Sequence, residues 1–123
     1  MEALGSQTWL IPDMYWPEVT TEGHYVSHEA ICVLNITDRD CKLDITLYFE
    51  DREPVSGFTA VCPARRTNHI RMDKIVDANG RQVPMGVPYA AVVKSNVPVT
   101  VQYTRVDTTQ NANSLMTTMA FPL

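Results

Sequence analysis

The densest group of side chains that could bind an anion lies between Pro63 and Arg71. Read as a strand that begins at Arg65, this segment has two faces, one with Arg65, Thr67, His69 and Arg71 and the other with Arg66, Asn68, Ile70 and Met72. The first face is polar throughout, and the guanidinium forks of arginine suit a carboxylate or phosphate held by two hydrogen bonds. The plainer alternative, which we favour, is a solvated strand face.

A second segment, from Trp9 to Glu29, mixes aromatic rings with polar groups. Its members include Trp9, Tyr15, Trp16, His24, Tyr25, Ser27 and His28. A ring can pack against the C–H face of a flat ligand such as a sugar, while neighbouring groups accept hydroxyl protons. Alternatively, the rings close the open end of the fold. The spacing of His24 and His28 does not bring both onto one metal ion, and no third ligand is evident, so we expect no metal site.

A third segment, from Ser95 to Asp107, becomes polar towards its end. As a strand, it places Val97, Val99 and Val101 on one face with Tyr103, Arg105 and Asp107. A buried charged group must be paired, because otherwise its desolvation costs several kcal/mol. The pattern therefore predicts an interaction between Arg105 and Asp107 inside the fold, or a pocket rim.

The residues offer little for catalysis. The chain has no GxSxG elbow, no glycine-rich phosphate loop and no HExxH motif. His28 and Glu29, with His69 elsewhere, could supply an acid and a base, but neighbours on a strand point to opposite faces. We expect a protein that is not an enzyme and needs no cofactor; a small hydrolase remains an alternative.

Short segments rich in β-branched and aromatic residues, separated by turn residues, position these groups. We expect strands near Thr8–Ile11, Glu29–Thr37, Cys41–Glu50, Gly57–Cys62, Thr67–Met72, Ala90–Ser95, Val99–Asp107 and Leu115–Phe121. No long 3.6-residue period is present, so any helix is a turn or two, near residues 73–76. The sequence predicts one all-β domain over residues 1–123, an antiparallel β-sandwich of about eight short strands.

Two of these strands carry informative patterns. Residues 41–50 alternate between apolar and polar side chains, as expected for a strand with one face on the core and one in water. Residues 30–36 are apolar on both faces, so both faces of the strand have to be shielded from water. Either other strands or a second subunit provides the second cover, and we favour self-association.

Composition restricts the partners of the chain. The 123 residues are 45% hydrophobic, and the formal net charge is −4. An acidic chain has little non-specific affinity for nucleic acid or acidic lipid. No apolar run is long enough to cross a bilayer and the N-terminus lacks a signal peptide, so we expect a cytoplasmic protein without direct membrane insertion. The three cysteines form no CxxC pair, and Cys32 and Cys62 have the apolar neighbours of buried residues.

Several segments in this order and spacing together resemble the sensory rhodopsin transducer family. They are Ser27–Glu29, Val33–Asn35, Ile45–Phe49, Asp51–Pro54, Pro63–Arg71, Ser95–Pro98 and Val101–Asp107. The resemblance covers the chain from about Trp9 to Phe121, and the PARRT and SNVP stretches are its most specific parts.

The resemblance implies a β-sandwich that assembles as a homotetramer and acts as a cytoplasmic binding or signalling module. It implies two classes of partner, a membrane sensory receptor and small molecules such as sugars. The family motifs map onto Trp9, His28, Glu29, Asn35, Arg65, Arg66, His69, Arg71, Asn96, Gln102 and Arg105. Two residues depart from the pattern: Cys62 stands where valine is expected, and Tyr103 stands where the family's namesake has a histidine.

The leading hypothesis is that the aromatic segment and the arginine face meet in one ligand site, near a sandwich end or a subunit boundary. The second is a protein-interaction surface for a membrane receptor. A nucleic-acid-binding regulator that uses Arg65, Arg66 and Arg71 is a weaker alternative, because the chain is acidic and no groove-reading helix is expected.

Overall fold

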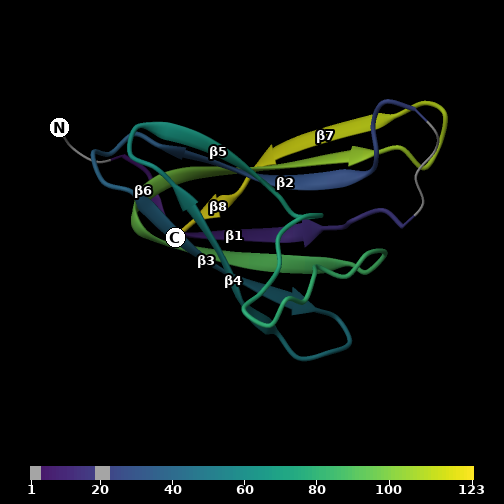
Figure 1. The fold of residues 1–123 in the computed structure, drawn as a ribbon, viewed down its shortest axis with the longest axis horizontal. Coiled ribbons are helices and arrows are strands. Elements are labelled where there is room, and N and C mark those ends of the chain that lie inside the picture. Colours follow the sequence, from purple (N-terminus) through teal and green to yellow (C-terminus); the bar gives the residue numbers. More distant parts are fainter. Residues whose placement is uncertain (1–3, 19–22) are drawn as a thin grey trace.

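The computed structural model describes residues 4–18 and 23–123, and eight antiparallel strands make up most of this part of the chain (Figure 1). The strands are β1 (Ser6–Met14), β2 (His28–Asn35), β3 (Cys41–Phe49), β4 (Val55–Cys62), β5 (Arg66–Arg71), β6 (Tyr89–Asp107), β7 (Ser114–Met119) and β8 (Phe121–Pro122). The prediction of an all-β sandwich is confirmed.

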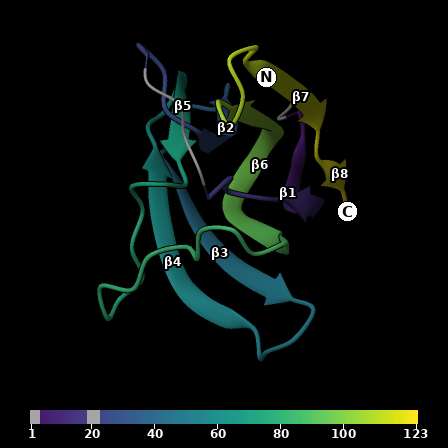
Figure 2. The same ribbon diagram turned by 90° about the vertical axis from the view of Figure 1, so that its right-hand side faces the viewer.

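The strands form two layers that share β6. The first half of β6 pairs with β3 and β1, which gives the order β4-β3-β6-β1-β8. The second half pairs with β2 and β7, which gives a second layer in the order β5-β2-β6-β7. Figure 2 shows the sharp bend of β6 that folds one layer over the other.

The bend of β6 lies in the SNVP stretch, where two separate strands were expected. One β1 residue, Gln7, faces residues 95–98 of β6, because Thr8 pairs with Lys94 and Ser6 with Val99. Such a bulge turns a strand and accommodates Pro98, which has no N–H to donate. The Gln7 side-chain amide donates to the carbonyl of Asn96 at 3.0 Å. The strand therefore continues through the proline and changes layer there.

The expected last strand, in contrast, is divided in two. β7 pairs with β6 in the second layer, and β8 pairs with β1 in the first layer. The buried Ala120 lies between them and its N–H donates to the carbonyl of Val101. The segment near residues 73–76 is a single turn, closed by the N–H of Ile75 donating to the carbonyl of Arg71 at 3.1 Å.

The core lies between the layers and follows the predicted alternation. In β3, Leu43, Ile45 and Leu47 are at most 1% exposed, whereas Lys42 and Asp44 face water. Burying such side chains contributes about 1.5–3 kcal/mol each. On β2 the core-facing residues are Glu29, Ile31, Val33 and Asn35, all buried. A carboxylate and an amide thus occupy the two ends of an otherwise apolar row.

The opposite face of β2 is only partly covered. Ala30 is 7% exposed, but Leu34 is 48% exposed. The layer that contains β2 therefore has an outer face with apolar side chains in contact with solvent.

Candidate functional site

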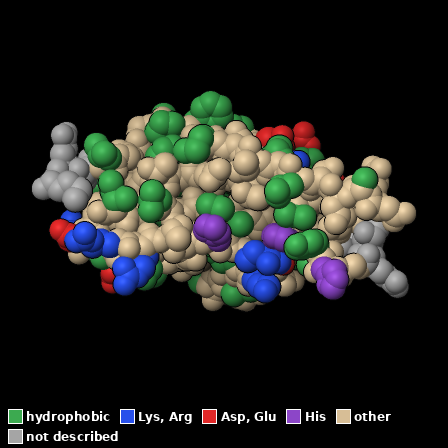
Figure 3. Space-filling model, turned by 90° about the horizontal axis from the view of Figure 1, so that it is seen from above, with side chains coloured by type: hydrophobic (Ala, Val, Ile, Leu, Met, Phe, Trp, Pro, Cys, Tyr) green, Lys and Arg blue, Asp and Glu red, His purple; other side chains and the backbone are tan. Residues whose placement is uncertain are grey.

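Four of the predicted site residues lie on the outer face of the β5-β2-β6-β7 layer, which we call the outer face below. Direct pairing places His69 of β5 and Gln102 of β6 on either side of Cys32. Arg71 pairs with Ala30, two residues from His28 on the same face. Figure 3 looks onto this side of the molecule, where hydrophobic side chains lie among histidine and basic ones.

The centre of the outer face is a shallow depression with a volume of about 160 Å³. It is lined by Cys32, Val33, Leu34, Thr67, His69, Thr100, Gln102 and Met119. Gln102 donates to the hydroxyl of Thr117 at 2.8 Å, and Met119 of β7 is 52% exposed. The outer face therefore presents apolar side chains and hydrogen-bonding side chains next to one another, and both are accessible to a partner.

The core-facing side of β2 begins with a buried carboxylate. Glu29 is 1% exposed and accepts hydrogen bonds from Tyr103 (2.5 Å) and Tyr89 (2.7 Å) and from the backbone N–H of Tyr15 (2.8 Å). Tyr89 and Tyr103 lie near opposite ends of β6, one in each layer. The carboxylate of Glu29 therefore connects the two layers and the segment that follows β1.

Burial controls the ionisation of this cluster. Desolvation raises the pKa of Glu29, and the hydrogen bonds that the carboxylate accepts offset this only in part. The pKa of Tyr89 is raised well above its usual value by burial and by the nearby Glu29. The pKa of Tyr103 is also raised, by burial and by the nearby Glu29. Both hydroxyls therefore stay protonated and act as donors to Glu29.

Arg105 lies at the rim of the same cluster, and the predicted Asp107 is not its hydrogen-bond partner, although the charge of Arg105, after the hydrogen bonding from Thr109, helps to lower the pKa of Asp107. The guanidinium donates to the hydroxyl of Tyr103 at 3.1 Å and to the carboxylate of Asp13 at 3.2 Å. Asp107 instead accepts a hydrogen bond from the backbone N–H of Thr109. Asp13 comes from β1, a strand distant in sequence, so the alternation within β6 could not reveal it.

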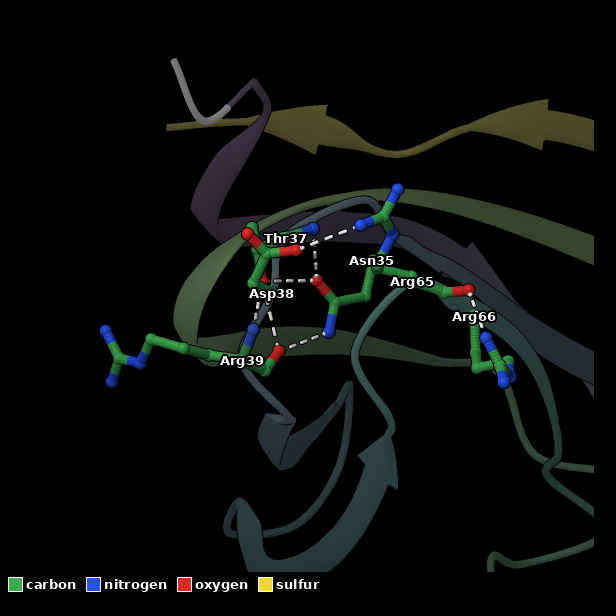
Figure 4. A network of polar contacts seen from close by, with 6 residues as sticks. All are labelled: Asn35, Thr37, Asp38, Arg39, Arg65 and Arg66. Atoms are coloured by element: carbon green, nitrogen blue, oxygen red, sulfur yellow. Dashed lines mark hydrogen bonds and ion pairs between the residues drawn. The ribbon is translucent and has the colours of Figure 1, made fainter. Parts of the chain in front are cut away.

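Asn35 organises the other end of β2. Its side-chain amide donates to the carbonyls of Arg39 (2.8 Å), Cys62 (3.0 Å) and Pro63 (3.3 Å). Its Oδ1 accepts from the backbone N–H and the hydroxyl of Thr37, at 3.0 Å and 2.7 Å. Figure 4 shows Asn35 in the middle of this network. One fully buried side chain thus holds two turns together.

Arg65 and Arg66 lie in the turn that Asn35 holds. Both side chains are exposed, and Arg65 forms an ion pair with Asp38 at 3.4 Å. Figure 4 shows the side chains of Arg39, Arg65 and Arg66 pointing away from one another. The three guanidinium groups therefore do not converge on one anion.

Asn96 lies in the bend of β6. It accepts a hydrogen bond from the backbone N–H of Lys42 at 2.7 Å and donates to the carbonyl of Asp40. These bonds fix the start of β3 against the bend.

The two tryptophans of the aromatic segment pack in or against the core, whereas Tyr25 of the same segment is exposed. Trp9 is 5% exposed, and its indole N–H contacts the carbonyls of Ser6 and Val99. Trp16 packs against the core and donates to the carbonyl of Ser27 at 3.2 Å.

The hypothesis that the aromatic segment and the arginine face meet holds within one chain only at the Arg71 end of that face, where Arg71 pairs with Ala30 and lies near His28. Arg66 pairs with Asn35 at the end of β2, whereas the aromatic segment leads into His28 at its start. Arg65 and Arg66 therefore lie at the opposite end of β2 from the aromatic segment (Figure 1), whereas Arg71 lies near it. Part of the aromatic segment, residues 19–22, lies outside the described residues.

Three residues of these sites were not singled out from the sequence. Tyr89 belongs to the Glu29 cluster, Asp13 pairs with Arg105 at the rim of that cluster, and Met119 lies on the outer face. Residues 115–119 do not alternate between apolar and polar side chains, so no local pattern indicated Met119, and none links Tyr89 to a carboxylate 60 positions away.

Searches for other site types cover the described residues only. In residues 4–18 and 23–123, no three His, Cys, Asp or Glu side chains are grouped so as to hold a metal ion. The same part of the chain forms no helix with the length and hydropathy required to cross a bilayer.

The fold and the site together define a small antiparallel β-sandwich whose two layers share one bent strand and whose outer face is open. The family model described as Anabaena sensory rhodopsin transducer matches residues 4–122. The chain belongs to this family, which confirms the resemblance found in the sequence.

Two solved structures are similar to the chain. The crystal structure of Thermotoga maritima 1070 is 35% identical, with a TM-score of 0.86, and the match covers 97% of this chain and 96% of that one. The Anabaena sensory rhodopsin transducer is 37% identical, with a TM-score of 0.76 and coverage of 86% and 92%. A search of curated proteins finds no match.

Proposed function

We propose that this protein is a cytoplasmic binding and signal-transducing module that recognises a partner protein through its outer face. The observation that carries the proposal is the mixture of exposed Leu34 and Met119 with His69 and Gln102 on one open sheet. Protein interfaces combine apolar contacts with hydrogen-bonding groups in this way.

The shape of the outer face favours a protein over a small molecule. Its depression holds about 160 Å³, whereas pockets for small ligands typically hold roughly 300–1,000 Å³. Membership in a family named for a sensory rhodopsin transducer supports a membrane sensory receptor as the partner.

The test is a titration of the protein with a detergent-solubilised seven-helix photoreceptor of the same organism. Replacing His69 or Gln102 by alanine removes a central contact, so we expect the affinity to fall about tenfold. Lys42→Ala, on the exposed face of the first layer, is the matched control and should bind like the wild type. Equal affinity for all variants, or no binding, would count against the proposal.

We also propose that the protein forms a homo-oligomer, with the family's tetramer as the expected state. Leu115, Met116, Phe121 and Leu123, on and after β7, are 37–75% exposed, which supports a contact between copies. Light scattering during size-exclusion chromatography measures the mass directly. We expect a tetramer in the wild type and smaller species in a Leu115→Asp variant, with Lys42→Ala again as the control. A monomeric wild type would contradict the proposal.

Small-molecule binding is a second candidate, supported by a groove between β1 and β7. The groove holds about 330 Å³ and is lined by Ile11, Pro12, Asp13, Met116, Thr118, Met119 and Phe121. This lining suits a mostly apolar ligand with one donor for the Asp13 carboxylate. A thermal-shift screen with sugars and small apolar alcohols should find a ligand that raises the melting temperature. Met116→Trp, which fills the groove, should abolish that shift, and a panel without any hit would exclude the candidate.

A further inference from the structure

Two of the three cysteines face each other across neighbouring strands. Cys41 is the first residue of β3, and Cys62, the last residue of β4, is its direct partner in the antiparallel register. Both are 0% exposed, and directly paired residues place their side chains on the same face of a sheet. Figure 2 shows the two strands running side by side. The two side chains therefore leave the sheet on the same side, with the Cys41 sulfur against the hydroxyl of Ser95 and the Cys62 thiol donating to the carbonyls of Val33 and Arg66.

This position meets the geometric requirement for a disulfide. The Cα atoms of directly paired residues in an antiparallel sheet are about 4.5–5.5 Å apart. Disulfides in proteins span Cα separations of about 4.4–6.8 Å. Both thiols are free in this structure, and the pKa of Cys62 is raised by burial and, to a smaller extent, by the neighbouring Cys41. A bond between the sulfur atoms thus requires little movement of the backbone.

We propose that Cys41 and Cys62 form an oxidation-sensitive pair that closes into an intrachain disulfide when the protein meets a peroxide. One thiolate attacks the peroxide and becomes a sulfenic acid, with release of hydroxide. The second thiol attacks the sulfenic sulfur, which forms the S–S bond and releases water. Overall, two thiols and one hydrogen peroxide give one disulfide and two waters.

Local opening at the strand ends gives the oxidant access to the pair. Burial raises the pKa of both thiols, so the closed structure holds them in their less reactive form. Both residues lie at strand ends, however, next to the exposed Asp40 and Pro63. Strand ends open far more often than strand centres. Oxidation of the pair is therefore slower than that of an exposed thiol, but specific to one product.

The bond would form directly beneath the turn that carries Arg65 and Arg66. Asn35 donates to the carbonyl of Cys62, and Asp40 accepts from the backbone N–H of Ala64 at 2.9 Å. The disulfide would link the start of β3 to the end of β4, next to the hydrogen bonds that Asn35 and Asp40 already make to Cys62 and to the segment after it. Forming the disulfide would also break the contact between the Cys41 sulfur and the hydroxyl of Ser95, which are 3.1 Å apart. Ser95 lies in the bend of β6. Oxidation would therefore stiffen the turn and change the hydrogen bonding of the bend.

The experiment uses the folded protein with Cys32 replaced by serine, because Cys32 is the half-exposed thiol and lies on another strand. The protein is treated with hydrogen peroxide, denatured, alkylated and digested. We expect a linked Cys41–Cys62 peptide, lighter by two hydrogens, that dithiothreitol separates. A link across this loop should raise the melting temperature by roughly 10 °C.

A Cys32→Ser, Cys62→Val variant is the matched control and should show neither the link nor the thermal shift. Two other results would overturn the proposal. In one, both thiols are fully alkylated after a peroxide dose that oxidises Cys32 in the wild type. In the other, Cys41 and Cys62 each gain oxygen atoms without becoming linked. Because the wild type can be digested in the same way, the result does not depend on the folding of any variant.

Discussion

The two ends of β2 hold buried polar side chains on the same face, but the two side chains differ in kind. Glu29 and Asn35 are both at most 1% exposed and six positions apart. Glu29 accepts from two tyrosine hydroxyls and a backbone N–H, whereas Asn35 both donates and accepts, mostly with backbone groups. One end of the sandwich is thus held by side chains around a titratable group, and the other by a neutral amide that holds turns.

This difference determines how each end responds to its surroundings. The Asn35 amide has no charge to gain or lose, so the hydrogen bonds that it makes itself do not depend on its protonation. Glu29 can take up a proton, and protonation would change which of its oxygen atoms accept hydrogen bonds. Sensitivity to pH is therefore expected at the Glu29 end and sensitivity to truncation at the Asn35 end.

The largest effect is expected from Asn35→Ala, which tests the amide end. The change removes three donated and two accepted hydrogen bonds, among them the bond to the carbonyl of the buried Cys62. We expect the free energy of unfolding to fall by about 3 kcal/mol or more in urea denaturation. The control is Asn68→Ala, which loses one bond to the carbonyl of Val61 and should cost about 1 kcal/mol or less. Similar losses for both variants would show that the network is not cooperative.

The next effect is expected from Tyr103→Phe at the carboxylate end. The variant loses the hydroxyl that donates to Glu29 and accepts from Arg105, so the buried carboxylate keeps fewer donors. We expect a loss of roughly 2 kcal/mol by thermal or urea unfolding at neutral pH. Tyr48→Phe, at an exposed position, should change stability by less than about 0.5 kcal/mol. An unchanged free energy of unfolding in Tyr103→Phe would mean that Glu29 does not depend on this donor.

The pH dependence of Glu29→Gln sharpens the comparison. The pKa of Glu29 is higher in the folded than in the unfolded chain, so the folded state holds the proton more tightly. The stability that this group contributes is complete below its unfolded pKa and is lost as pH rises through the folded value. The stability of the wild type relative to Glu29→Gln should therefore decrease from about pH 4 upwards.

The difference between the variant and the wild type, followed by urea unfolding across pH, isolates this contribution. Other carboxyls act in the opposite direction; the hydrogen bond from the backbone N–H of Arg81, for example, lowers the pKa of Asp77. Asp44→Asn, on the exposed face of β3, is the control that removes an exposed carboxyl in place of the buried one. A constant difference between Glu29→Gln and the wild type would contradict a raised pKa.

The smallest effect is expected from Asp13→Asn. Asp13 is paired with Arg105, but its side chain is 84% exposed, and exposed ion pairs contribute little. We expect a change of less than about 0.5 kcal/mol in the free energy of unfolding, with the pH dependence unaltered. A loss above about 1 kcal/mol would show that Asp13 belongs to the buried cluster after all.

Most of the architecture could be predicted from the sequence because strand formation leaves a local pattern. The alternation of residues 41–50 and the turn residues that separate the segments predicted the layers and most strand positions. The exceptions occur where the chain passes between layers. At Pro98 a bulge carries β6 through a residue that normally ends a strand, and at Ala120 a strand is divided because its halves pair in different layers.

The candidate site was less predictable, since it depends on which strands become neighbours. Family motifs indicated His69, Arg71 and Gln102, which do share the outer face. The same motifs include Asn35 and Asn96, whose polar atoms bind backbone groups of the chain itself.

The sequence by itself determined the all-β fold, the core-facing side of residues 41–50 and the family, because residue order alone carries these patterns. Only the tertiary structure decided that the arginine turn and the aromatic segment lie apart, that Glu29 meets Tyr89 and that Cys41 faces Cys62. Contacts of this kind follow from strand register and from the bend of β6, and neither is written in any single segment.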